Sequence, residues 1–75
     1  MPHVVVQMYP GRDEDTKMEL AKAVAETISN KLNMRKEAIS VSIQEVEKDN
    51  WKTEVYDKVT KDENKEVYIK PGYDM

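Results

Sequence analysis

The chain has 75 residues, a net charge of −3 and no cysteine. Its length corresponds to one small domain over residues 1–75, close to the lower limit of what an apolar core stabilises without disulfides, metal or partner subunits. Mixed charge without a basic patch argues against a nucleic-acid partner, and the absence of a long apolar stretch argues against a membrane span or a secretory signal, so we expect a cytoplasmic protein.

Residues 3–8, with the sequence HVVVQM, form the first predicted strand, because β-branched residues dominate a run too short for a buried helix. The turn sequence Tyr9-Pro10-Gly11 ends it. A helix is predicted next, since apolar residues recur at every fourth position in one stripe, at Leu20, Val24, Ile28 and Leu32. Asp13 is its expected N-cap and Asn33 its expected end.

Residues 38–46, AISVSIQEV, alternate between an apolar and a polar face, which predicts a second strand. Strand, helix and strand in this order make a βαβ unit with parallel strands and a right-handed crossover. The expected fold class is therefore α/β (α+β). Two strands and one helix cannot close a stable core alone, so we expect another copy of the chain to complete the sheet.

The chain becomes more densely charged after residue 47. Asn50 is the predicted N-cap of a short helix that carries Trp51, Val55 and Val59 on one side, and the polar stretch KDENKE then interrupts it. The tail VYIKPGYDM leaves two alternatives open, because residues 67–69 suit either a helical turn or an edge strand before the chain turns at Pro71-Gly72.

Three residues occur in a familiar pattern: Pro2 opens the first strand, Arg12 lies in PGRDED at the start of the helix, and Trp51 follows the second strand. Their spacing resembles the 4-oxalocrotonate tautomerase family, and the ending IKPGYDM is similar to that of its PptA-type branch. The resemblance covers nearly the whole chain and implies a βαβ tautomerase fold without cofactor or metal. It also implies a homo-oligomer, with a dimer favoured by the PptA-type branch and the hexamer common elsewhere in the family as the alternative.

The resemblance implies that Pro2, exposed as a secondary amine by removal of Met1, is the catalytic base. An α-amino group ordinarily titrates near 7.7–8.0, and both burial and a nearby cation lower that pKa toward neutrality. The alternative is a proline that merely begins a strand. Arg12 is the expected ligand of a substrate carboxylate, because its planar fork of donors matches that group; the alternative is a solvated arginine beside acidic residues.

The resemblance also assigns Trp51 as an apolar wall of the site, although the same residue could simply anchor the packing of its helix. Ser40 occupies the position where family members that act on dicarboxylates carry a second arginine. Its hydroxyl is a substrate-binding candidate, with a solvent-facing or interface serine as the alternative. His3 is left out, because strand alternation directs its side chain to the face opposite Pro2.

The expected function is enol–keto tautomerisation of small 2-oxo acids, and arylpyruvate-type monocarboxylates are favoured because Ser40 is uncharged. Two alternatives stay open. One is a non-catalytic binding subunit on the same scaffold, and the other is a Pro2-dependent hydratase or dehalogenase, for which we find no added carboxylate to activate water. The tyrosines Tyr9, Tyr56, Tyr68 and Tyr73 are candidates for an oligomer interface, with no reason to choose one.

Overall fold

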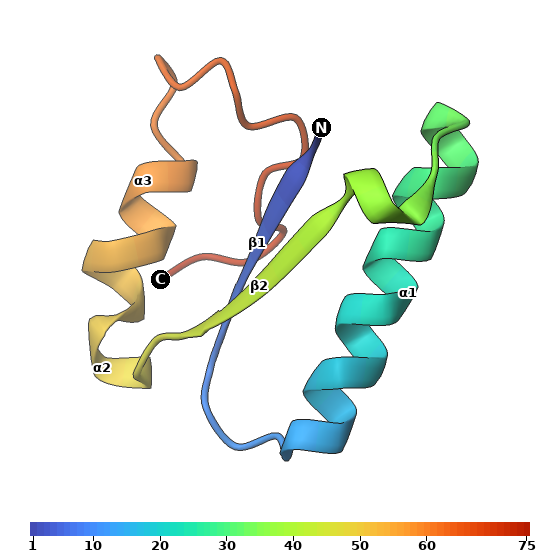
Figure 1. Cartoon of the computed structure of the whole chain (residues 1–75). Coiled ribbons are helices and arrows are strands. Elements are labelled where there is room, and N and C mark those ends of the chain that lie inside the picture. Colours follow the sequence, from blue (N-terminus) through green and yellow to red (C-terminus); the bar gives the residue numbers. More distant parts are fainter. The chain divides into compact units, whose positions relative to one another are not determined.

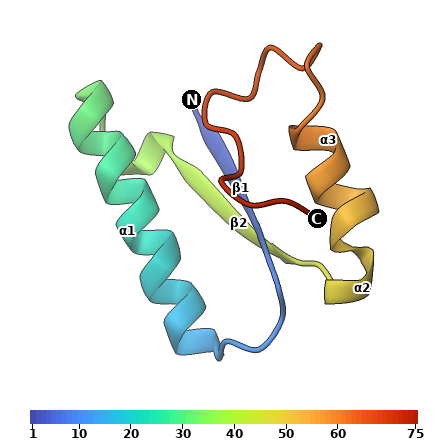
Figure 2. The same cartoon turned by 180° about the vertical axis from the view of Figure 1, so that it is seen from behind.

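The structure is a computed structural model that describes all residues, 1–75. The chain divides into two compact units, Met1–Glu45 and Val46–Met75. The first unit contains two strands and a long helix, and the second contains a helical segment followed by an irregular tail (Figures 1 and 2). That residues 1–75 act as a single domain stays a prediction.

The two strands of the first unit are β1 (His3–Met8) and β2 (Ser40–Glu45), which pair in parallel from His3 opposite Ser40 to Met8 opposite Glu45. One face is half-buried and apolar, and it carries Val4, Val6, Val41 and Ile43. The other face is exposed and mostly polar. The alternation predicted from the sequence is therefore confirmed, and it specifies the register, because a slip of one residue would expose every apolar side chain.

Helix α1 (Glu14–Leu32) connects the two strands and runs alongside them (Figure 1). The Asp13 carboxylate accepts a hydrogen bond from the Thr16 backbone N–H at 2.8 Å, which satisfies a donor that the first turn leaves unpaired. Asn33 ends the helix in the left-handed conformation, with φ 53°. A 3₁₀ turn, η1 (Lys36–Ala38), then leads into β2. Both predicted helix ends and the parallel βαβ order are confirmed.

The second unit begins with one continuous helical run, made of α2 (Lys48–Trp51), the π-helical η2 (Lys52–Tyr56) and α3 (Asp57–Val59). The prediction that Asn50 caps this helix is wrong. Helical backbone starts at Lys48 after an extended Glu47, and the Asn50 N–H already donates to the Glu47 carbonyl at 2.9 Å. An earlier start also places the negative charge of Asp49 in the first turn, where the helix dipole favours it.

The tail after α3 forms turns and bends, so residues 67–69 are neither a helical turn nor an edge strand. Asn64 explains part of this outcome. Its amide group donates to the Lys58 carbonyl at 3.0 Å and accepts from the Glu66 N–H at 3.1 Å. Such side-chain bonds to the backbone compete with regular structure. None of the helices combines the length and the apolar character needed to cross a bilayer.

Candidate active site

Pro2 lies directly before β1, where its missing N–H costs no bond of the strand ladder. Its carbonyl accepts the Ser40 backbone N–H at 3.2 Å, which ties this end of the chain to β2. The residue is half-buried, like alternate residues along β1, whereas Met1 is 97% exposed. While Met1 is attached, the Pro2 nitrogen is an amide without basicity, so its use as an amine requires that Met1 be removed.

Ser40 lies next to Pro2 along the ladder, but its side chain is on the other face of the sheet. Its hydroxyl shares a hydrogen bond of 2.6 Å with Nδ1 of His3, its cross-strand neighbour. The Ser42 hydroxyl lies 3.4 Å from Nε2 of the same ring. The structure therefore pairs Ser40 with His3 on the exposed face, and within one chain it does not bring the Ser40 hydroxyl to the face of Pro2.

Arg12 is exposed in the loop between β1 and α1, one residue before the helix cap. The loop turns at Gly11, whose φ of 130° is a conformation that other residues rarely adopt. This loop follows the end of β1 (Figure 1). Pro2 precedes the start of the same strand. A six-residue strand extends about 20 Å, more than an arginine side chain spans. One chain therefore does not bring Arg12 and Pro2 together.

Trp51 belongs to the second unit, at the end of α2, and is half-buried. Its indole Nε1–H donates to the Tyr73 hydroxyl at 3.0 Å. The Tyr73 ring in turn lies 5.6 Å from the ring of Tyr56, centroid to centroid, with a tilt of 35°. Sequence reasoning grouped Tyr73 with the other tyrosines. The Pro71-Gly72 turn directly before it is the signal that could have singled it out, because a turn redirects the following side chain.

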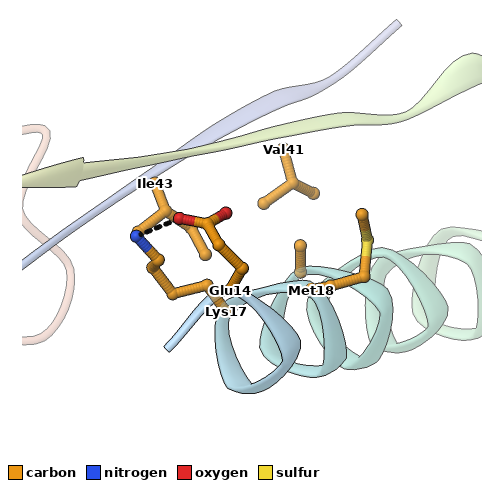
Figure 3. A pocket seen from close by; sticks show the side chains of 6 residues that line it. Glu14, Lys17, Met18, Val41 and Ile43 are labelled. Atoms are coloured by element: carbon orange, nitrogen blue, oxygen red, sulfur yellow. Dashed lines mark ion pairs between the residues drawn. The ribbon is translucent and has the colours of Figure 1, made fainter. Parts of the chain in front are cut away.

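A groove of about 260 Å³ lies between α1 and β2 (Figure 3), lined by Glu14, Lys17, Met18, Ala21, Val41 and Ile43. None of the predicted site residues lines it. The Lys17 amine pairs with the carboxylates of Glu14 at 3.0 Å and Glu45 at 3.4 Å. The hydrogen bond to Glu14 raises the pKa of Lys17, which keeps this amine charged and unsuited to act as a base at neutral pH.

A parallel βαβ unit whose first strand directly follows a proline, with an arginine at the entrance of its helix, is the arrangement that the resemblance to small tautomerases implied. The chain belongs to the Tautomerase enzyme family, whose sequence model matches residues 2–63 and so begins at Pro2. Membership of this family supports a tautomerase activity, which is an isomerase reaction. No group of three or more histidine, aspartate or glutamate side chains is placed to hold a metal ion.

Relatives at the level of single proteins agree with the family match. Tautomerase PptA from Enterobacter sp. (strain 638) is 35% identical over 77 aligned positions, which cover 100% of both chains. A probable tautomerase from Xylella fastidiosa (strain 9a5c) is 32% identical over 73 positions, covering 97% of this chain and 89% of that protein. The crystal structure of YwhB, a homologue of 4-oxalocrotonate tautomerase, superimposes with a TM-score of 0.61 at 35% identity, over 64% of this chain and 79% of that one. The predicted family, its PptA-type branch and the tautomerase fold are thus confirmed.

Proposed function

We propose that the chain catalyses enol–keto tautomerisation of small 2-oxo acids, with the Pro2 nitrogen as general base after removal of Met1. The observation that carries this proposal is the position of Pro2, which is half-buried at the head of β1 and opens the family match. Partial burial disfavours the charged form of an amine and moves its pKa toward neutral pH. A base with a pKa near the ambient pH both accepts and returns a proton efficiently.

The proposed reaction is a 1,3-proton shift. The Pro2 nitrogen takes the proton of the enol hydroxyl, the carbonyl forms, and the electron pair of the C=C bond becomes available at carbon. The proline then gives its proton to that carbon, where the electron pair forms the new C–H bond, and the amine returns to its neutral form. Arg12 holds the carboxylate through paired hydrogen bonds and stabilises the charge that develops beside it, and Trp51 covers the apolar part of the substrate.

The distance between Pro2 and Arg12 in one chain adds a condition to this mechanism. The arginine that serves a given Pro2 is proposed to be Arg12 of the partner subunit in a homodimer. A two-fold axis perpendicular to the sheet places the start of one β1 near the end of the other, because the two strands then run antiparallel. A dimer is the smallest assembly that provides this arrangement, and a hexamer built from such dimers is the larger alternative.

The proposed substrates are arylpyruvate-type monocarboxylates. Ser40 supplies no positive charge for a second carboxylate, and its hydroxyl is engaged by His3. Loss of one charge-assisted contact costs on the order of 1.5–3 kcal/mol, which corresponds to roughly one or two powers of ten in binding. Enols with one carboxylate and an aryl or alkyl group are therefore expected to react better than dicarboxylates.

The test compares phenylenolpyruvate with 2-hydroxymuconate as substrates of the Met1-free chain and of Pro2→Ala. We expect phenylenolpyruvate to have the higher kcat/KM, by about tenfold or more. Pro2→Ala should lower kcat/KM by roughly 10²- to 10⁴-fold, the usual contribution of a general base, while circular dichroism stays unchanged. Equal rates for both proteins would show that Pro2 is not the base. A preference for 2-hydroxymuconate would contradict the interpretation of Ser40, and binding without turnover would favour a non-catalytic subunit.

A further inference from the structure

We propose that Tyr73 is a positioning residue of this site, which orients the Trp51 indole and thereby determines how tightly aryl substrates bind. The inference rests on the proposed function, because it takes Trp51 as the apolar wall against which the aryl group packs. All the contacts that carry it lie within the second unit, Val46–Met75.

The Trp51 indole is hydrogen-bonded to the tail. Its Nε1–H donates to the Tyr73 hydroxyl at 3.0 Å, across 22 positions of sequence. The Trp51 side chain is half-buried, so its burial alone does not determine its orientation. A hydrogen bond at one edge of the ring is directional and restricts that orientation.

The π-helical segment η2 places a second aromatic ring where it can hold Tyr73. In an ordinary α-helix, residues five positions apart are separated by about 140° around the axis, so Trp51 and Tyr56 would diverge. In η2 the Asp57 N–H donates to the Lys52 carbonyl, five residues back. The helix is therefore wider here, and residues five positions apart are about one turn apart. Trp51 and Tyr56 both contact Tyr73, Trp51 through its hydrogen bond of 3.0 Å and Tyr56 with its ring 5.6 Å from the Tyr73 ring.

The orientation of the Trp51 indole and the packing of the two tyrosine rings depend on different parts of Tyr73, its hydroxyl and its ring. Removal of the Tyr73 hydroxyl keeps both tyrosine rings and removes the hydrogen bond that orients the indole. An indole without this hydrogen bond is less well oriented and binds an aryl group less tightly. Proton transfer at Pro2 does not depend on it. The expected effect therefore falls on KM and leaves kcat unchanged.

The experiment compares Tyr73→Phe with Tyr68→Phe, a matched control that removes the same hydroxyl from a side chain that is 94% exposed. Trp51 is the sole tryptophan, so its fluorescence reports on this indole directly. For Tyr73→Phe we expect emission at longer wavelength and a KM for phenylenolpyruvate raised by roughly two- to tenfold, the range for one neutral hydrogen bond, at constant kcat. Tyr68→Phe should change neither quantity.

Trp51→Phe supplies a second comparison, because it keeps an aromatic wall and lacks the N–H. Adding Tyr73→Phe to Trp51→Phe should raise KM no further, since the interaction is already absent. The inference is overturned if Tyr73→Phe leaves emission unchanged, if emission shifts while KM does not, or if KM rises equally in both backgrounds. If no enol acid is turned over, the proposed function fails, and titration of Trp51 emission with phenylpyruvate, compared between wild type and Tyr73→Phe, still decides the role of Tyr73.

Discussion

The chemistry of residue 2 depends on the bond that precedes it. In a Met1-Pro2 peptide the nitrogen lone pair is delocalised into the carbonyl, and no degree of burial restores its basicity. Once Met1 is absent, the same nitrogen is a secondary amine, on a residue that is half-buried in the full-length chain. The remaining contacts of this residue, above all the bond from the Ser40 N–H to the Pro2 carbonyl, do not involve that nitrogen.

We therefore predict that a chain retaining Met1 keeps its fold and loses nearly all tautomerase activity. The fold should persist because Met1 is 97% exposed and contributes little packing. Intact mass, thermal unfolding and rate with phenylenolpyruvate, measured on the same preparations, check this expectation. Full turnover by a preparation that is uniformly Met1-bearing would exclude Pro2 as the base.

At the scale of elements, β1 and α1 determine where Pro2 and Arg12, the two polar groups of the proposed mechanism, lie. The six residues of β1 separate Pro2 from the loop that carries Arg12. The cap at Asp13 fixes where that loop ends and α1 begins, since its carboxylate accepts the Thr16 N–H. The Thr16 hydrogen bonds lower the pKa of Asp13 below its ordinary value of 3.8.

The Asp13 cap gives a pH-dependent stability. A lowered pKa in the folded state means that the stabilisation is complete above pH 3.8 and is lost as the pH falls through the folded pKa. Asp13→Asn should cap equally well at neutral pH and lack this component of the acid sensitivity. Asp13→Ala should lower the free energy of unfolding at every pH above the folded pKa of Asp13. Urea unfolding of the three proteins between about pH 2 and 6 measures this. Parallel pH profiles for the wild type and Asp13→Asn would contradict it.

Local patterns were sufficient to predict the strands, the long helix and both of its ends. Each of these depends on residues close in sequence, such as the alternation around Val41 or the cap at Asp13. The misplaced start at Asn50 and the π-helical turn depend on competition between neighbouring backbone bonds, which composition does not resolve. The contacts of Ser40 with His3 and of Trp51 with Tyr73 join distant positions, so they required the strand register and the path of the tail.

At the scale of the whole molecule, the isolated chain has little interior. Val46 and Val55 are its buried hydrophobic residues, and α1 has no buried residue at all. Met18 and Leu32 on that helix are 57% and 59% exposed. A core this small is marginal for independent stability, and a second copy that covers α1 would supply the missing apolar contact. The same second copy is the proposed source of the arginine that serves Pro2.

Subunit complementation tests both requirements together. Pro2→Ala and Arg12→Ala should each be nearly inactive alone. A heterodimer of the two variants, isolated through a different tag on each chain, contains one site with both substitutions and one with neither. It should therefore show about half of the wild-type activity, because a two-fold dimer has two equivalent sites. A doubly tagged Pro2→Ala homodimer is the control and should stay inactive. If the heterodimer is as inactive as its parents, Pro2 and Arg12 act from the same chain, and β1 would have to be distorted to bring them together.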